Sequence, residues 1–199
     1  LDLYQIPDNV GDSNPDDVYL DNPPVTPNDE VTMQELLKAG NGPVTITPIA
    51  DFGVSSSTAE TVRFGHYTPG NTNDITELLT IAGSANSQTV NPAYSGAASF
   101  DPGSAAFSLY ANFPSMYPSV YSVPGGTWAY QEDALNASYD PNSPRKVRFY
   151  PLKNADGTVF PNAFVMTTED YNASYDTQDF VAIIRNVKAA PSGPEIGFV

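Results

Sequence analysis

The residues of this chain most able to do chemistry are the oxygen donors between positions 169 and 179. Four carboxylates occur in these eleven residues, together with asparagine, serine, threonine and tyrosine. Carboxylates this close repel one another unless cations or hydrogen-bond donors neutralise them. Calcium suits such hard oxygen donors, and Arg185 is the only basic residue within reach in the sequence. We therefore predict a calcium site formed by the carboxylates of Glu169, Asp176 and Asp179, with Asn172 as a further carbonyl ligand.

Two other roles stay open for the same segment. Its carboxylates can be hydrogen-bonded structural caps of the loop. Alternatively, two of them can act as the acid and the nucleophile or base of a glycosidase.

A second oxygen-rich stretch covers residues 8–17, where Gly11 permits a sharp turn among the donors. It lacks the spacing of an EF-hand, in which a glutamate closes the loop at position 12. The pattern predicts further calcium ligands at Asp8, Asp12 and Asp16, and a solvated acidic arm is the alternative.

The chain has few side chains that could act as nucleophiles or as ligands of soft metal ions. The chain has no cysteine, which excludes disulfides, thiol catalysis, zinc–thiolate sites and iron–sulfur clusters. A Ser-His-Asp triad would have to use His66, the only histidine, yet no Gly-x-Ser-x-Gly sequence occurs. His66 lies in a strand-like pattern, so a hydrogen-bonded structural histidine is the expected role.

Aromatic residues are concentrated between Phe100 and Tyr130. Within this region, residues 110–121 contain too much proline for a regular strand and are expected to expose some rings on a loop. Exposed rings among asparagine and serine can stack on sugars or anchor a protein partner, whereas core packing is the alternative for each ring. We predict a ligand-binding edge at Phe113, Tyr117 and Tyr121.

Strands are the main elements that would position these groups. Alternation of apolar and polar residues predicts strands at 44–49, 61–67, 107–110 and 127–130. A hairpin is expected from Val147–Tyr150 through the Asp156-Gly157 turn to Ala163–Met166. The strand at 179–187 is apolar on both faces for four positions, which places it in the centre of a sheet.

Two short helices are also expected, at Thr32–Leu37 and Asp74–Leu79. In each, a residue that can cap a helix precedes a glutamate and a short apolar face.

Composition excludes several classes of protein. Eight Lys and Arg against 23 Asp and Glu give a net charge of -15, which disfavours nucleic acid and anionic membrane surfaces as partners. No run of 18 apolar residues exists, so we expect no membrane insertion. The 19 prolines and 14 glycines favour short strands joined by loops. The expected fold is all-β, an antiparallel β-sandwich of jelly-roll-like type.

We expect three parts in the chain. Residues 1–40 form an extended acidic, proline-rich arm with a short helix, residues 41–190 the β-sandwich domain, and residues 191–199 a linker-like tail. Half of the basic residues are expected to pair with the acidic loops or with the arm of a neighbouring copy: Arg145, Lys146, Arg148 and Lys153. Asn136 and Asn172 match the acceptor pattern for N-glycosylation.

Several short stretches carry a family resemblance. The strongest are Val147-Arg148-Phe149-Tyr150-Pro151-Leu152-Lys153, Pro161-Asn162-Ala163-Phe164-Val165, Glu169 and Gln178-Asp179-Phe180-Val181, and further ones lie at 43–50, 64–67, 100–110 and 132–136. Through them, residues 43–188 resemble a β-rich C-terminal module of large secreted bacterial proteins, found beside immunoglobulin-like and sugar-dehydrogenase-like domains. The resemblance implies a non-catalytic β-sandwich with the Glu and Asp of its last loop in a structural or calcium-binding position. Here that loop, Tyr175-Asp176-Thr177-Gln178-Asp179, is longer than the compact Asp-Tyr-Gln-Asp pattern of the module.

Two functions are therefore expected ahead of an enzyme. The first is a non-catalytic extracellular binding or adhesion module, directed at carbohydrate or another cell-surface partner and stabilised by calcium. The alternative is a self-assembling subunit of a surface filament or layer, whose N-terminal arm docks on a neighbouring copy.

Overall fold

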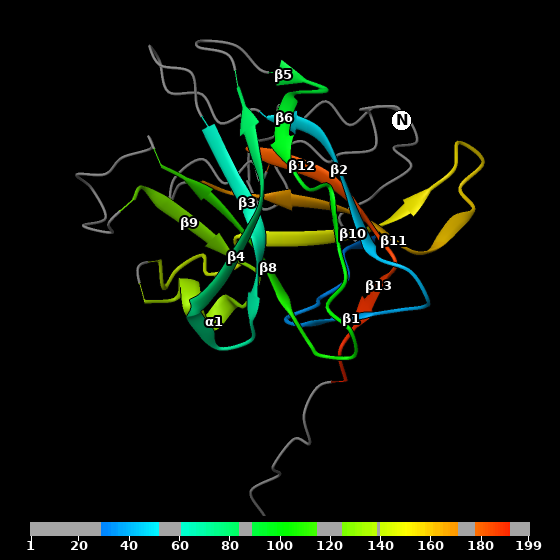
Figure 1. Cartoon of the computed structure of the whole chain (residues 1–199), viewed down its shortest axis with the longest axis horizontal. Coiled ribbons are helices and arrows are strands. Elements are labelled where there is room, and N and C mark those ends of the chain that lie inside the picture. Colours follow the sequence, from blue (N-terminus) through cyan, green and yellow to red (C-terminus); the bar gives the residue numbers. More distant parts are fainter. Residues whose placement is uncertain are drawn as a thin grey trace, which may run out of the picture.

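The fold is built almost entirely of antiparallel strands (Figure 1). The structure is a computed structural model that describes residues 29–51, 61–83, 89–114, 125–138, 140–170 and 178–191. Within these ranges the one α-helix is α1 (Asp133–Asn136), and no helix there is long and apolar enough to cross a membrane. The all-β class expected from the sequence is confirmed.

The first large sheet contains six strands. Their order is β10 (Val147–Lys153), β11 (Val159–Thr168), β12 (Phe180–Arg185) and β2 (Val44–Asp51), with β5 (Thr89–Val90) and β7 (Ser99–Phe100) both pairing with β2. Strand β12 lies between β11 and β2, so its predicted central position is confirmed.

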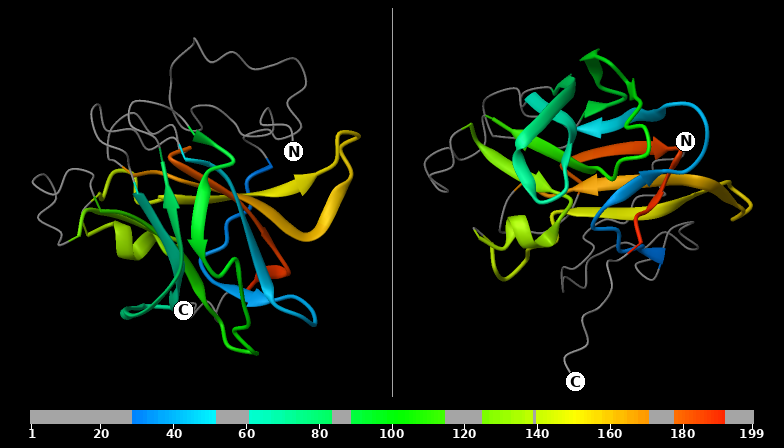
Figure 2. Two further views of the ribbon diagram at one scale, coloured as in Figure 1. Left: turned by 45° about the horizontal axis from the view of Figure 1, so that its top comes forward. Right: turned by 60° about the horizontal axis from the view of Figure 1, so that its bottom comes forward.

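The second large sheet contains five strands, in the order β6 (Ala93–Gly96), β4 (Asn71–Ala82), β3 (Thr61–Thr68), β8 (Ser108–Phe113) and β9 (Thr127–Tyr130). A two-stranded ribbon pairs β1 (Leu36–Lys38) with β13 (Val187–Ala189). Figure 2 shows these sheets from two further directions.

Most of the buried apolar side chains form two clusters. The main cluster contains side chains from both large sheets, and Phe64 of β3 contacts Phe180 of β12 with ring centroids 5.4 Å apart. The second cluster consists of residues of β2, β10, β11 and β12 only, including Val181 and Ile183. Successive residues of β12 thus alternate between two apolar environments, which explains why this strand is apolar on both faces.

The predicted hairpin between β10 and β11 is also confirmed. The backbone N–H of Gly157 donates to the carbonyl of Asn154 (2.9 Å), and Gly157 has a φ of 83°, which a glycine adopts without strain. The Asp156 carboxylate accepts from the N–H of Thr158 (3.0 Å) and closes the turn. Figure 1 shows this hairpin extending beyond the rest of the sheet.

The helix predicted at Thr32–Leu37 is wrong. Backbone groups of this segment bond to other elements instead of to their own turn: Val31 N–H donates to the carbonyl of Phe149 (2.8 Å), and Leu36 N–H to that of Phe107 (2.8 Å). Leu36 belongs to β1 and is completely buried in the main cluster. Long-range pairing therefore prevails over a local capping pattern.

The helix predicted at Asp74–Leu79 is wrong as well, because these residues lie within β4. Phe64 pairs with Leu79 and Gly65 with Glu77, so Leu78 is the extra residue of a β-bulge. The bulge lets both consecutive leucines enter the main cluster. Two adjacent apolar residues of this kind resemble one face of a short helix in the sequence.

Asn136, in α1, is fully buried and structural. Its side-chain amide donates to the carbonyls of Tyr130 (2.7 Å) and Pro144 (2.8 Å), and its oxygen accepts from the N–H of Tyr130 (3.0 Å). A glycan would replace one of the two hydrogens on this nitrogen, so one donated bond would be lost, and the fully buried site leaves no room for a sugar. Asn172 lies outside the described residues.

A buried ion pair fixes the segment that leads into β10. The Nζ atom of Lys146 lies 2.7 Å from Oδ2 of Asp140, and the two side chains are only 2% and 4% exposed. The same lysine accepts, through its backbone carbonyl, a hydrogen bond from the N–H of Glu169 (2.9 Å). The ion pair thus helps to position the first residue after β11.

We expect Lys146→Met to lower the free energy of unfolding by about 3–5 kcal/mol, because it leaves the Asp140 carboxylate buried without its cationic partner. Urea denaturation measures this loss. The double variant Lys146→Met, Asp140→Asn should recover most of the stability, whereas Lys188→Met, at an exposed position, should change it by less than about 0.5 kcal/mol. An equal loss in the single and double variants would contradict this role of the pair.

Candidate metal centre

Three carboxylates meet where β11 ends and β12 begins. Glu169 and Asp170 follow Thr168, the last residue of β11, and Asp179 precedes Phe180, the first residue of β12. One ligand oxygen from each carboxylate lies within 4.8 Å of the other two, and all three residues are buried. We call these three residues the carboxylate cluster.

Hydrogen bonds across the strand ends set the geometry of the cluster. Asp179 N–H donates to the carbonyl of Thr168 (3.1 Å), and Phe180 N–H donates to the Thr168 hydroxyl (3.2 Å). The backbone N–H of Asp170 donates to Oδ2 of Asp179 at 2.6 Å, a short contact of the charge-assisted type. The two strand ends are thereby held together, and the carboxylates cannot move apart freely.

A fourth buried carboxylate lies at the same end of the sheet. Asp51 is the last residue of β2, is 1% exposed, and stands opposite Phe180 in the register. Negative charge is therefore concentrated at the ends of three adjacent strands: β2, β11 and β12.

The structure places only some of the predicted calcium ligands. Glu169 and Asp179 are brought together as expected, and Asp170 joins them although it was not predicted as a ligand. Its position next to Glu169 was the only signal. Asn172, Asp176, Asp8, Asp12 and Asp16 lie outside the described residues, so their predicted roles stay predictions.

The predicted role of Phe113 in ligand binding is wrong. Phe113 is the last residue of β8, is 0% exposed, and belongs to the main cluster. Its register partners explain this, because Phe113 stands opposite Thr127 and two residues from Ala111, which also faces the main cluster. Tyr117 and Tyr121 lie outside the described residues.

The basic residues of the β10 region bind acidic groups of the same chain. Arg148 contacts Glu30 at 2.7 Å, Arg145 contacts Glu30 at 3.1 Å, and Lys153 contacts Asp29 at 2.8 Å. The two acidic residues at the end of the N-terminal stretch are therefore bound by the protein's own domain. Arg145 also pairs with Asp133 at 3.2 Å.

His66 has a packing role. Its ring is stacked on Phe100 with centroids 4.3 Å apart and contacts Phe107 edge-on. Burial lowers the pKa of His66 from its ordinary value, and the nearby charge of Asp74 partly offsets this shift. His66 is not part of the carboxylate cluster.

Comparisons with known proteins give no relative for this chain. No family model, curated protein or solved structure matches it.

Phe113→Ala should lower the free energy of unfolding by about 3–5 kcal/mol, because it empties a ring-sized volume in the main cluster. Urea denaturation tests this. Tyr94→Ala removes a ring that is 49% exposed on the same sheet and should cost far less. Equal effects of the two substitutions would contradict the assignment of Phe113 to the core.

His66 should make the protein less stable in mild acid. A histidine whose pKa is lower in the folded protein binds protons more readily when unfolded, so its contribution is complete above about pH 6.5 and is lost as the pH falls through the folded-state pKa. We expect the loss of unfolding free energy between pH 7 and pH 5 to be smaller in His66→Gln than in the original protein. An unchanged pH dependence would show that His66 does not contribute to it.

Proposed function

We propose that this protein is a non-catalytic extracellular binding module, directed at carbohydrate and stabilised by calcium. In this proposal the two large sheets form a β-sandwich of jelly-roll-like type. The observation that carries the calcium assignment is the carboxylate cluster, in which three buried acidic side chains place ligand oxygens within 4.8 Å of one another.

The donor set favours calcium over other ions. Calcium takes six to eight oxygen ligands in flexible geometry, and carboxylates supply one or two oxygens each. Zinc and copper prefer nitrogen and sulfur donors, and neither is found among the members of this cluster. Glu169, Asp170 and Asp179 would hold the ion, which would neutralise their mutual repulsion and brace the connection between β11 and β12.

Burial argues against a glycosidase centre in the same cluster. Glu169 is 3% exposed, Asp170 7% and Asp179 8%, which leaves little room for a sugar to reach them. The oxygens lie within 4.8 Å of one another, which is too close for an inverting glycosidase (about 6.5–9.5 Å) but near the spacing of a retaining one (about 5–5.5 Å), so burial is the argument against both.

The alternative function, a self-assembling surface subunit, depends on docking of the acidic N-terminal arm on a neighbouring copy. Asp29 and Glu30 instead form ion pairs with Lys153, Arg145 and Arg148 of their own chain. These contacts favour the binding module, since the four basic residues predicted to accept a neighbour's arm all form ion pairs within their own chain.

Thermal melts with calcium and with a chelator test the calcium proposal. At a hundredfold excess over the dissociation constant, a ligand that binds only the folded state adds about 2.7 kcal/mol. For a domain of this size we therefore expect a melting temperature about 5–10 °C higher with calcium. Magnesium should give a smaller shift, because it requires a tighter octahedral geometry.

The variant Asp179→Asn separates a metal site from a hydrogen-bonded cap. Asparagine keeps an oxygen for the Asp170 N–H but removes one negative charge. A metal site predicts that the calcium-dependent shift disappears, while the melting temperature in chelator stays equal or rises because repulsion is relieved. Glu35→Gln, which removes a carboxylate outside the cluster, should retain the full shift. Identical melts of the original protein with calcium and chelator would refute the calcium proposal.

A further inference from the structure

The face of the five-stranded sheet that points away from the main cluster is rich in aromatic rings. Phe64, Ala111 and Ala129 are register neighbours on β3, β8 and β9, and all three belong to the main cluster. Because side chains alternate along a strand, the residues next to them project to the opposite face. Tyr110 and Tyr130 stand opposite each other there, and Trp128 is two residues from Tyr130.

Four rings form a continuous row on this face. Tyr67 contacts Tyr130 edge-on with centroids 5.5 Å apart, Tyr130 stacks on Trp128 at 5.6 Å, and Trp128 contacts Tyr110 at 5.4 Å. Tyr67 and Tyr110 are buried but belong to neither apolar cluster. Trp128 and Tyr130 are half-buried and so keep part of their surface in contact with solvent. We call these four residues the aromatic face.

Fixed contacts hold the rings in place. A side-chain carbon at Gly65 would clash with the carbonyl oxygen of Thr76 on β4 and lie 2.9 Å from Cε1 of Tyr110, so only glycine fits between the β4 backbone and this ring. The Asn112 amide donates to the carbonyls of Gly125 (2.8 Å) and Thr127 (2.9 Å), which fixes the start of β9 next to Trp128. The rings are therefore positioned before any ligand arrives, which lowers the entropic cost of binding.

The other end of the row is fixed through Glu132. Its carboxylate accepts from the N–H of Gly70 (3.0 and 3.1 Å), and its own N–H donates to the hydroxyl of Tyr67 (3.4 Å). The turn between β3 and β4 is thereby joined to the end of β9.

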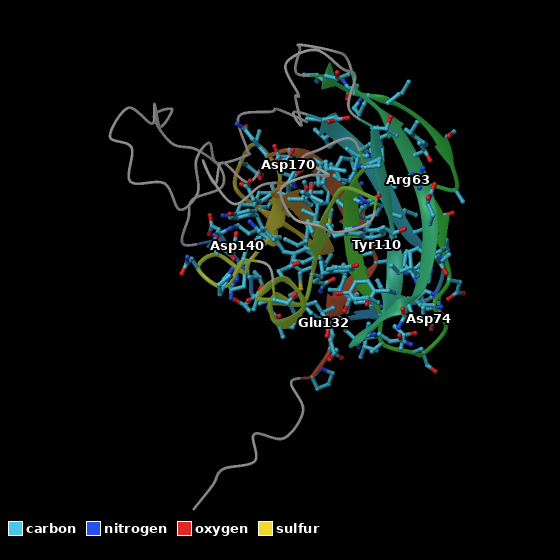
Figure 3. The ribbon with its side chains drawn as sticks, turned by 90° about the vertical axis from the view of Figure 1, so that its left-hand side faces the viewer. Arg63, Asp74, Tyr110, Glu132, Asp140 and Asp170 are labelled. Atoms are coloured by element: carbon cyan, nitrogen blue, oxygen red, sulfur yellow. The ribbon has the colours of Figure 1, made fainter. Side chains whose placement is uncertain are left out.

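Charges of both signs lie beside the rings. Arg63 stands opposite Asn112, Glu77 stands opposite Gly65, and both are exposed. Burial and the charge of Glu77 raise the pKa of Tyr110, which Arg63 partly offsets, and burial raises the pKa of Tyr130 to about 12. The phenols therefore remain protonated donors at ordinary pH. Figure 3 shows Arg63 and Tyr110 over the strands of this sheet and Glu132 below them, with Asp140 and Asp170 to the left in that view.

We propose that the half-buried rings of Trp128 and Tyr130, with Arg63 and Glu77 along the same face, bind a neutral oligosaccharide, while the buried rings of Tyr67 and Tyr110 support them from within the sheet. This inference rests on the proposed function as a carbohydrate-binding module and assigns its site. A sugar ring has an apolar face that can pack on an aromatic ring and hydroxyl groups that can bond to a carboxylate, a guanidinium and the phenol of the half-buried Tyr130. Two exposed charges of opposite sign favour a neutral ligand, because the attraction of a charged ligand to one of them is offset by its repulsion from the other.

A protein partner fits this face less well. The large apolar side chains that are well exposed in the described parts of the chain are Val90, Tyr94, Val159 and Phe160, on β5, β6 and β11. None belongs to the aromatic face. Apolar protein docking would be expected at those residues instead.

The chain contains a single tryptophan, Trp128, which makes the site directly observable. Tryptophan fluorescence should be titrated with cellohexaose, xylohexaose and mannohexaose, with polygalacturonic acid and chitosan oligomers as charged counterparts, and binding should be measured in parallel by calorimetry. We expect at least one neutral sugar to bind, to shift the Trp128 emission and to protect it from acrylamide quenching. The charged sugars should bind at least about tenfold more weakly.

Three variants complete the test. Trp128→Ala should weaken binding of that sugar at least about tenfold, as loss of a central aromatic contact commonly does. Glu77→Gln, at an exposed position, should weaken binding without lowering the melting temperature. Tyr94→Ala removes an exposed tyrosine that pairs with Ile81 and lies on the other face of the same sheet, so affinity should not change.

The outcomes separate this inference from the proposed function. Sugar binding by calorimetry with unchanged Trp128 fluorescence, or with full affinity in Trp128→Ala, would overturn the aromatic face as the site and leave a carbohydrate-binding module. Preferential binding of a charged sugar would overturn the neutral-ligand assignment. Absence of binding to the whole set, and to a broader glycan array, would refute the carbohydrate proposal itself, while the calcium melts would still stand on their own.

Discussion

Strand β12 is buried on both of its faces, and the arrangement of the six-stranded sheet depends on this constraint. Phe180, Ala182 and Ile184 enter the main cluster, while Val181 and Ile183 enter the second. Such a strand has to lie between two partners, and β11 and β2 supply them. Because β12 begins directly after Asp179, its packing brings that carboxylate to the end of β11, beside Glu169 and Asp170. The repulsion within the carboxylate cluster is thus imposed by apolar burial of the adjacent strand.

Among the described residues, the five-stranded sheet has an apolar cluster on only one of its two faces. Its inner face meets the main cluster, but its outer face carries aromatic rings at positions where a solvated sheet usually carries polar side chains. Gly65 permits this, because a neighbouring tyrosine ring can lie over the bare backbone of β3. Glycine within a strand weakens it, and close packing of a ring over the glycine compensates part of that loss. The aromatic face therefore contributes to the packing of the sheet. Its half-buried members, Trp128 and Tyr130, also form part of the protein surface.

Features coded by adjacent residues could be predicted from the sequence. The β10–β11 hairpin has its Asp-Gly turn, and β12 has an uninterrupted apolar run. Features that depend on register could not: Leu78 enters the core through a bulge, and Leu36 through pairing with Phe107 and Ala189. Phe113 was assigned to a loop because prolines follow it, although alternation with Ala111 places it in the core. Likewise, Tyr67, Tyr110 and Trp128 become neighbours only once three strands are aligned.

The two proposed sites share one physical connection. Phe180, next to Asp179 of the carboxylate cluster, packs against Phe64, which precedes Gly65 beneath the Tyr110 ring. The rings, however, are positioned by contacts within their own sheet, through Asn112 and Glu132. A cation bound at the carboxylate cluster, as proposed, would therefore stabilise the fold that carries the aromatic face without having to touch a ligand there. Coupling between the sites would pass through the main cluster, of which the Phe64–Phe180 contact is part, and by linkage it would act equally in both directions.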